Sequence, residues 1–490
     1  MNNNMNFDKI MMQMEDKDKP PEGVNDLEPF IMGINTLGRR DLAVECLDTF
    51  AKVARMFEQY DNLSKCYFKL KEYMKGIETA EKCLELCPTP QHEYVTRFNL
   101  INLYNHANYP EKAMEFIKIN EKAHPSVDLD LEKAYSLYLL ERKPEAREIL
   151  EQALINRKDL SEQTRIKIKF NLGTYYLYQD KFQLGLRHFM LEGAKMKLWQ
   201  VESIFARNKK LNFEFWEGDP EIKNLIVYAE AGIGDEIINV RFMKHLKDRG
   251  VNAIWYTATQ AGKNQKNDRP GLTEMFEKNG VPIVTSLDEV PKLSDWQWTY
   301  SMRLPIYLGL EYSDLWYGPY LKACPEFKKK WQFKGKKKRI GLRWQGSKFY
   351  DHDLHRSYPV KQLYEAIGKA DAEFISLQKD DGVEEIPDFP GLVDISDKLE
   401  TLEDTLALIA NLDYVVTSCT SVAHMAASQG KRTFILVPIS AYYTWSHSGK
   451  QSPWYGDHVT LLRQKRPRVW DEPIAELVTY LKKENLINED

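Results

Sequence analysis

The chain has 490 residues, of which 43% are hydrophobic and 12% aromatic, so it is long enough for two or three domains that each bury a core. Its formal net charge of -4 argues against a protein that wraps nucleic acid along its whole surface, although a local basic patch remains possible. Six cysteines are too few and too scattered for a disulfide framework, which favours reduced thiols and a cytoplasmic location.

The N-terminal segment is polar and ends near Pro20 and Pro21, and we expect residues 1–22 to form a disordered tail. No run of apolar residues reaches the length of about 18 that a transmembrane helix requires. The sequence therefore predicts no membrane span.

Small residues recur in helical patterns through the first half, at intervals of 33, 37, 33 and 39 residues: Ala43, Gly76, Ala113, Ala146 and Gly185. A small side chain lets two paired helices approach closely, so this spacing is typical of stacked helical hairpins. The pattern resembles the tetratricopeptide repeat (TPR) over about residues 27 to 200, as four or five units. We expect a TPR-like α-helical solenoid over residues 23–212.

The resemblance to TPR proteins implies a concave surface that binds a protein partner or an extended acceptor, and a spacer or dimerisation module is the alternative. Tyr67, Tyr104 and Tyr176 recur where helix packing alone would place them, so we expect them in the core. Cys83 and Cys87 lie four residues apart on one predicted helix. Packing is favoured over a metal pair there, because no second CxxC or histidine pair lies nearby.

The periodicity changes after Lys223, where short β-branched runs alternate with helical stretches. Strands are expected at 225–229, 253–258, 340–344, 373–378, 414–418 and 433–438. This order predicts two Rossmann-like lobes, residues 213–330 and 331–490, with a cleft between them. The basic stretch 328–339 falls between the lobes, as a solvated linker or as a contact for an anionic partner.

A glycine-rich turn, residues 231–235, joins the first strand to a helix and ends at Asp235. Gly232 and Gly234 permit a tight turn there, and Asp235 either faces the cleft or caps the helix. A dinucleotide-binding site is disfavoured. The turn lacks the third glycine of the GxGxxG motif that such sites carry, and no acidic residue ends the next strand.

A run rich in hydroxyl residues, 417–424, follows the apolar residues 414–416 of a predicted strand and leads into a helix. Its hydroxyl groups and free N–H groups fall at the carboxyl end of a strand, where the helix dipole favours a phosphate. His424, one turn into the helix, either donates to that phosphate or is structural.

Several motifs taken together resemble the heptosyltransferase-like (family 9-like) glycosyltransferases. They are GIGDEI, IGLRWQGS, HRSYP, SLQ, LALIANLDYVVTSCTSVAHMAASQGKRTFILVP and SPWYGDHVTLLRQ, in this order between about residues 222 and 485. The resemblance implies a GT-B fold with a nucleotide-sugar donor on the second lobe, an acceptor on the first, and inverting transfer. It also implies no cofactor and no metal, and the sequence contains no DxD motif.

The resemblance also assigns roles to residues. Asp235 matches the catalytic base, Arg356 the cation on the donor phosphates, and Thr420, Ser421 and His424 the phosphate-binding turn and helix. Cys419 departs from the family, because heptosyltransferases carry aspartate there.

The departure at Cys419 means that the sugar differs or that Gln378 or Lys379 makes the missing donor contact. On the acceptor side we expect Gly232 and Gly234 of the glycine turn. We also expect Tyr443, Trp445 and His447, which lie in a loop after the last long strand. Aromatic rings in that loop either stack on a sugar or base, or pack between the lobes.

The leading hypothesis is therefore a glycosyltransferase that moves a sugar from a nucleotide donor to a hydroxyl group of a protein, a glycan or another acceptor. The alternative is a protein without catalytic activity, an adaptor or assembly protein that only binds a glycan or a nucleotide. A modified nucleic-acid base as acceptor is a third hypothesis, which the acidic chain supports little.

Overall fold

The computed structural model describes residues 27–158, 160–196, 213–257, 271–290, 295–348, 353–379 and 381–488. The chain divides into two compact units between Asn156 and Arg157. The predicted tail and the predicted boundary at residue 212 lie outside the described residues. Within those ranges, no helix is long and apolar enough to cross a membrane.

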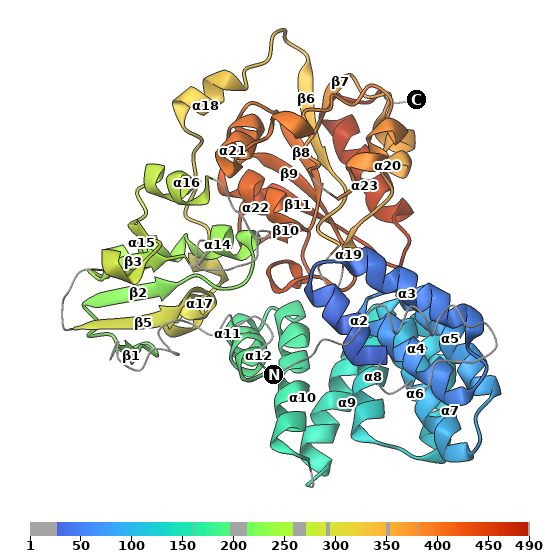
Figure 1. Cartoon of the computed structure of the whole chain (residues 1–490). Coiled ribbons are helices and arrows are strands. Elements are labelled where there is room, and N and C mark those ends of the chain that lie inside the picture. Colours follow the sequence, from blue (N-terminus) through green and yellow to red (C-terminus); the bar gives the residue numbers. More distant parts are fainter. Residues whose placement is uncertain are drawn as a thin grey trace. The chain divides into compact units, whose positions relative to one another are not determined.

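Helical hairpins make up the first unit and the start of the second (Figure 1). In the described ranges the hairpins are α2 (Leu27–Thr36) with α3 (Arg40–Val53), α4 (Phe57–Lys69) with α5 (Tyr73–Glu85), α6 (Pro90–His106) with α7 (Pro110–Ala123), α8 (Val127–Leu139) with α9 (Lys143–Asn156), and α10 (Glu162–Tyr178) with α11 (Phe182–Leu186). The last helix continues through a π-helical turn, η2 (Arg187–Glu192), into α12 (Gly193–Lys195). The predicted TPR-like repeat is confirmed, and its last hairpin belongs to the second unit.

Each hairpin turns at a residue in the left-handed region of backbone space. These residues, with φ between 58° and 78°, are Gly38, Lys71, Asn108, Glu141 and Asp180. Each lies five positions before the small residue that marks its repeat in the sequence. The next N–H closes the turn, as Glu72 N does on the carbonyl of Tyr67 at 2.9 Å. The turn and the close helix contact therefore repeat as one structural unit.

The small residues lie where helices touch. A Cβ atom on Gly173 would lie 2.5 Å from the backbone nitrogen of Phe189, and one on Gly185 would lie 2.8 Å from that of Leu177. Tyr67 and Tyr104 are buried as predicted, whereas Tyr176 is only half-buried. Cys83 is also buried, as packing requires.

The first lobe contains a parallel sheet in the order β1-β5-β2-β3-β4. Its strands are β1 (Glu214–Phe215), β2 (Asn224–Tyr228), β3 (Asn252–Tyr256), β4 (Ile283–Val284) and β5 (Trp296–Tyr300). The helices are α14 (Ile233–Asn239), α15 (Phe242–Asp248), α16 (Leu272–Lys278) and α17 (Leu304–Tyr307), and α18 (Pro325–Lys330) leads into the second lobe.

The second lobe contains a sheet in the order β10-β11-β9-β8-β6-β7, parallel except for β10. Its strands are β6 (Lys338–Arg343), β7 (Ala372–Ser376), β8 (Tyr414–Ser418), β9 (Arg432–Val437), β10 (Gln451–Ser452) and β11 (Gly456–Arg463). The helices are α19 (Asp353–Arg356), α20 (Val360–Ile367), α21 (Leu402–Ala410), α22 (Ser421–Ser428) and α23 (Asp471–Lys483).

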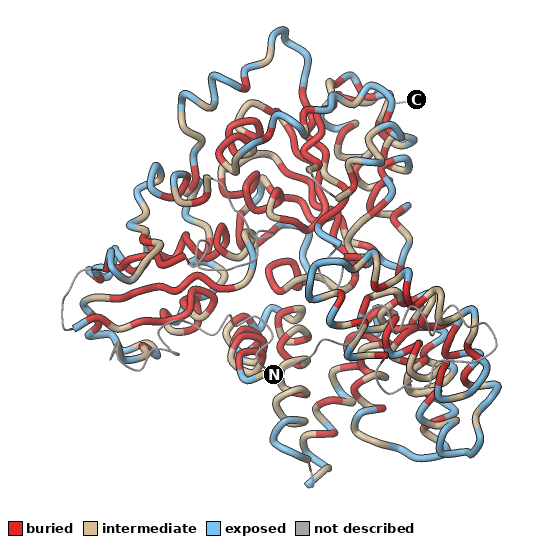
Figure 2. The backbone as a smooth tube through the Cα atoms, in the orientation of Figure 1, coloured by how far each residue is buried: buried red, intermediate tan, exposed pale blue. Residues whose placement is uncertain are grey.

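Alternate residues of the strands face different layers, as a period of two requires. In β8, Val416 packs in the cluster that holds Leu363 of α20 and Leu477 of α23, whereas Val415 packs in the cluster that holds Leu408 of α21. Figure 2 shows the strands of this sheet buried along most of their length. The predicted pair of Rossmann-like lobes is confirmed.

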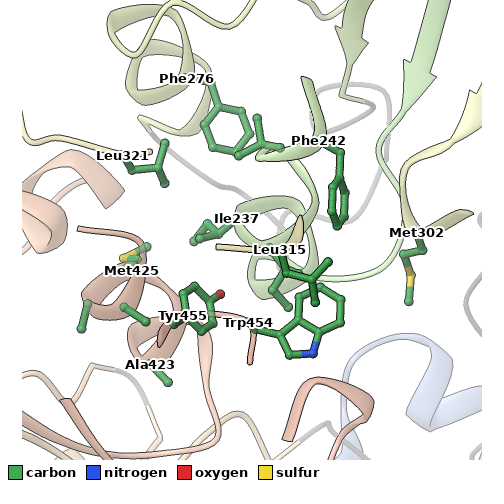
Figure 3. Packing of buried hydrophobic residues seen from close by; sticks show 14 of the residues in the cluster. Ile237, Phe242, Phe276, Met302, Leu315, Leu321, Ala423, Met425, Trp454 and Tyr455 are labelled. Carbon is green, nitrogen blue, oxygen red and sulfur yellow. The ribbon is translucent and has the colours of Figure 1, made fainter. Parts of the chain in front are cut away.

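One apolar cluster continues from the first lobe into the second (Figure 3). The ring of Phe242 meets that of Trp454 edge-on, with centroids 6.4 Å apart. Phe182 of the last helical hairpin also contacts Trp454, at 5.9 Å between centroids. The hairpin and both lobes therefore share a core.

The structure differs from the sequence prediction in the helix after the glycine turn. A single helix was expected, but α14 ends at Asn239 and α15 begins at Phe242. Between them Arg241 is only 1% exposed, and its Nε donates to the carbonyl of Ile238 at 2.8 Å. Strands β5 and β11 were not predicted as strands.

Helical glycines give a direct test of this packing. We expect Gly173→Ala to destabilise the second unit by about 1 to 3 kcal/mol, because the new methyl group would meet backbone atoms that cannot rotate away. Gly33→Ala in α2 is the matched control, since no atom lies within 4 Å of its Cβ position. Calorimetry should show a lowered transition for Gly173→Ala and an unchanged or slightly raised one for Gly33→Ala. Equal behaviour of the two variants would contradict the close contact.

Candidate functional site

Both sheets have a switch point, where neighbouring strands lead into connections on opposite sides. In the first sheet β2 lies between β3 and β5, and in the second β6 lies between β7 and β8. Loops that leave the carboxyl ends of strands at such a point form the usual ligand crevice of an open α/β sheet. The glycine turn follows β2 and the hydroxyl run follows β8, so the two predicted motifs lie at the two switch points.

A cavity of about 410 Å³ lies between these loops. Its lining residues are Ala231, Gly232, Gly234, Asp235, Ile238, Arg356, Cys419, Thr420, Ser421, His424, Pro438, Ser440, Tyr442 and Trp445. This volume falls within the usual range for small-molecule sites. The structure therefore brings nine of the predicted site residues to one cavity.

Asp235 is the carboxylate of the cavity lining. Its Oδ2 accepts a hydrogen bond from Gly232 N at 3.0 Å, and its Oδ1 accepts one from the Tyr442 hydroxyl at 2.8 Å. The first bond means that Asp235 does stabilise the start of α14, as the structural alternative required. The hydrogen bond from Tyr442 holds the carboxylate from the other lobe, so Asp235 does more than cap the helix.

The turn before Asp235 is conformationally unusual. Ala231 has φ of 65°, a region that non-glycine residues seldom occupy. At Gly234 a Cβ atom would lie 3.3 Å from Cδ2 of His424 and 3.7 Å from Cα of Ser421. Glycine at 234 therefore permits the close approach of α14 to α22.

Arg356 reaches the cavity from α19. Its Nε donates to Asp353 Oδ1 at 2.9 Å and its Nη1 to the carbonyl of Cys419 at 3.0 Å. Gly346 leaves the room for it, because a Cβ atom there would lie 2.0 Å from Nη2 of Arg356. The guanidinium is thus held against the loop that follows β8.

The N-terminus of α22 adds a second source of positive potential. Thr420 precedes its first residue, Ser421, and both line the cavity. The first N–H groups of a helix lack acceptors within the helix and favour an anion. The Thr420 Oγ1 atom is buried and has no hydrogen-bond partner in the described part of the chain. Cys419 beside it is uncharged, because burial raises the pKa of its thiol to about 12.

His424 lines the cavity one turn into α22 and is only 4% exposed. Its ring is stacked on Trp445, with centroids 4.8 Å apart and planes at 12°. Burial, and then the charge of Arg241, lower the pKa of this imidazole to about 3. At neutral pH His424 is therefore an uncharged group.

Four predicted site residues do not line this cavity. Gln378 is fully buried and its side chain binds backbone groups, accepting from Trp344 N at 3.3 Å and donating to the carbonyl of Gln345 at 3.0 Å. Lys379 Nζ donates to the carbonyl of Leu399. Their predicted donor contact stays a prediction, and both are engaged in joining loops of the second lobe.

Tyr443 and His447 belong to the aromatic loop and are both buried. The Tyr443 ring packs at 5.6 Å from Phe189 of η2 and at 5.5 Å from Trp454 of its own lobe, so these contacts are packing but do not join the two lobes. His447 Nδ1 accepts from Gly449 N at 3.1 Å. Trp445 differs from them, since it lines the cavity.

No family model matches this sequence, and no curated protein matches it either. Among solved structures, the "glycosyl transferase family 9 from Veillonella parvula" shows 13% identity and a TM-score of 0.33, covering 56% of this chain and 92% of that one. "E. coli ADP-heptose lps heptosyltransferase II" shows 13% identity and a TM-score of 0.33, over 54% of this chain and 100% of that one.

A TPR-type match is MamA from Desulfovibrio magneticus, with 14% identity and a TM-score of 0.28, over 38% of this chain and 100% of that chain. At these identities and TM-scores we take no residue role from any of the matches.

Sequence reasoning missed the part played by Tyr442, which lines the cavity, and by Glu230, which adjoins its lining residue Ala231 in the chain. Tyr442 holds Asp235, but in the sequence it is one of several aromatic residues in a loop and nothing marks its partner. Glu230 directly precedes the glycine turn and is only 3% exposed. Its Oε1 accepts from Met302 N at 3.2 Å, which ties the loop after β2 to the loop after β5 at the switch point.

Glu230 is a buried acid close to Asp235. Burial, opposed by Arg303 and by the hydrogen bond from Met302 N and assisted by the charge of Asp235, raises the pKa of its carboxyl group to about 8. Its Oε2 has no hydrogen-bond partner among the described residues. At neutral pH the carboxyl group is therefore largely protonated.

This pKa predicts how stability depends on pH. Between about pH 4.5 and 8 the unfolded chain has released the Glu230 proton and the folded chain retains it, so the free energy of unfolding falls by about 1.4 kcal/mol per pH unit as pH rises. Glu230→Gln removes this contribution, and urea unfolding at pH 5.5 and 7.5 should show the variant gaining stability relative to wild type at the higher pH. Glu274→Gln, at an exposed position of α16, serves as control. A constant difference between wild type and Glu230→Gln would contradict the protonated carboxyl.

Proposed function

We propose that the two lobes form a glycosyltransferase that moves a sugar from a nucleotide-sugar donor to a hydroxyl group. One observation carries the proposal: a carboxylate of the first lobe and a guanidinium plus helix N-terminus of the second line the same cavity. Group transfer from a diphosphate needs both a base and a site for the leaving anion, and in this chain they come from opposite lobes.

Asp235 is the base in this proposal. Gly232 N and the Tyr442 hydroxyl each donate a hydrogen bond to one of its carboxylate oxygens, so the carboxylate is oriented before the acceptor binds. As the acceptor oxygen attacks the anomeric carbon, its proton passes to Asp235. The bond from the anomeric carbon to the diphosphate oxygen breaks in the same step, so a single displacement inverts the configuration.

The departing nucleoside diphosphate gains negative charge, and Arg356 with the N-terminus of α22 supplies positive potential for it. The carbonyl of Cys419 and the carboxylate of Asp353 already orient the guanidinium. Because these partners fix Arg356 before the donor binds, little side-chain entropy is lost on binding. The uncharged thiol of Cys419 adds no negative charge to this part of the cavity, which suits a donor rich in phosphate charge.

The helical hairpins of the first unit are proposed to bind the acceptor or a protein partner. Stacked hairpins offer a continuous surface that no single hairpin provides. The nucleotide, the sugar and the acceptor are then recognised by different parts of one chain.

Donor binding is the first test. In the presence of a chelator, we expect one of the UDP-, GDP-, ADP-, CMP- or dTDP-linked sugars to raise the melting temperature and to give a calorimetric Kd. Arg356→Ala should weaken that Kd by about 10- to 100-fold, because it removes a charge-assisted hydrogen bond. Gly346→Ala should also weaken it, since the methyl group displaces the guanidinium without changing the charge.

Arg466→Ala is the control for charge, because Arg466 is exposed and pairs with Glu472 on the surface. Binding that survives Arg356→Ala and Gly346→Ala unchanged would contradict the assigned site. No binding of any of these donors would favour the adaptor hypothesis.

Turnover tests Asp235 separately. Asp235→Asn should reduce transfer by about 100- to 10,000-fold while donor affinity stays within a factor of about three, because a base acts on the acceptor in the transition state. Tyr442→Phe, which removes one hydrogen bond to Asp235, should give a smaller loss. Product formation with the donor found by calorimetry is the measurement, and undiminished transfer by Asp235→Asn would exclude this residue as the base.

A further inference from the structure

The buried side of the His424 ring contacts a single hydroxyl group. His424 Nδ1 lies 2.7 Å from the hydroxyl oxygen of Tyr455, which is fully buried. Trp445 stacks on both rings, at 4.8 Å from His424 and 5.8 Å from Tyr455. The imidazole plane is therefore fixed, and one of its two nitrogens is already engaged.

The shared proton belongs to Tyr455 on chemical grounds. An imidazole nitrogen is a far stronger base than a phenol oxygen, so the hydroxyl donates to Nδ1. The neighbouring hydroxyl of Tyr320 already accepts from Arg241 Nη2 at 2.8 Å and donates to the carbonyl of Ile237 at 2.9 Å. An oxygen that receives a charge-assisted hydrogen bond is a poorer acceptor, which leaves His424 as the better partner for Tyr455.

A buried positive charge keeps the imidazole neutral. The Arg241 guanidinium lies over the Tyr455 ring at 4.4 Å. In the described part of the chain its hydrogen bonds go to the carbonyls of Ile238, Leu315 and Trp454 and to the Tyr320 hydroxyl, and none goes to a carboxylate. Protonated His424 would face this charge without compensation. A neutral ring that accepts at Nδ1 carries its one proton on Nε2.

We propose that Tyr455 is a positioning residue that fixes His424 as the Nε2–H tautomer, so that an uncharged N–H donor faces an anionic oxygen bound in the cavity. The Cδ2–Nε2 edge of the ring is the one next to Gly234, where a Cβ atom would lie 3.3 Å from Cδ2 and 3.9 Å from Nε2. Gly234 lines the cavity beside His424. The ligand group that fits is a phosphate oxygen of the nucleotide-sugar donor, and this identification of the ligand rests on the proposed function.

The tautomer is measured without any donor. Nitrogen-15 NMR of the full chain with labelled histidine distinguishes Nε2–H, Nδ1–H and imidazolium rings, and the His424→Gln spectrum identifies the signal among the ten histidines. We expect Nε2–H in wild type at pH 7, and a loss of this single form in Tyr455→Phe. Tyr414→Phe is the matched control, because its hydroxyl binds Glu484 instead. An Nδ1–H ring or an imidazolium in wild type overturns the proposal.

Donor affinity tests the consequence. Tyr455→Phe should weaken donor binding by about 5- to 10-fold, the effect of one hydrogen bond. In a His424→Gln background, whose amide keeps a donor near the Nε2 position, Tyr455→Phe should have no further effect, because the hydroxyl acts only through the imidazole. A loss of equal size in both backgrounds overturns the positioning role.

The failure of the proposed function looks different. If wild type binds no nucleotide sugar, the glycosyltransferase proposal fails, and the NMR spectra still decide the tautomer. If Arg356→Ala abolishes binding and Tyr455→Phe leaves the Kd unchanged, the donor site stands and Tyr455 does not position His424 for the donor.

Discussion

The guanidinium of Arg241 is a full charge buried where the two lobes pack together, and the arrangement of the cavity depends on how that charge is accommodated. Taking such a group out of water costs several kcal/mol unless every donor finds an acceptor. Arg241 meets most of this demand by donating to the carbonyls of Ile238, Leu315 and Trp454 and to the Tyr320 hydroxyl. Its plane also lies over the rings of Tyr320, Trp454 and Tyr455, which offsets part of the remaining cost.

Accommodating Arg241 has two consequences for the site. In the first lobe it breaks one predicted helix into α14 and α15, which leaves α14 short and directed at α22. In the second lobe it fixes Trp454 and Tyr455 and, through Tyr455, the ring of His424. Gly234 then allows α14 to approach that ring closely. Asp235 of one lobe and Arg356 with the N-terminus of α22 of the other thus line one cavity, and the Arg241 contact that holds the lobes together is separate from that lining.

Much of this architecture is encoded locally and was predictable. The spacing of small residues from Ala43 to Gly185 follows from helix contact, and the same spacing recurs in the left-handed turn residues. The strands β2, β8 and β9 each contain three or four consecutive apolar residues, because parallel strands are buried on both faces. Strands β5 and β11 are interrupted by polar residues, so hydrophobic periodicity alone did not reveal them.

The site was predictable where its residues form local motifs and not where they act through distant partners. The glycine turn and the hydroxyl run each lie in one loop after one strand, so the switch-point position of Asp235 and Thr420 could be inferred. Tyr442, Glu230 and Arg241 carry no local signal, because their partners are 207, 72 and up to 213 residues away in the chain. Gln378 lies in a local motif and was predicted to contact the donor. In the structure its side-chain amide donates instead to the carbonyl of Gln345 in a neighbouring loop.

The distribution of charge limits what the cavity accepts. Asp235 and Arg356 reach it from different lobes, and each is oriented by neighbours in the structure: Gly232 and Tyr442 for the carboxylate, Asp353 and Cys419 for the guanidinium. Two opposite charges that were free to pair would neutralise each other and fill the space between them. Because their own partners hold them, the cavity keeps an acidic side and a basic side, and a ligand that suits both must carry an anionic group at one end and a proton-donating group at the other. A phosphorylated sugar meeting a hydroxyl acceptor has this polarity, and a simple anion has only half of it.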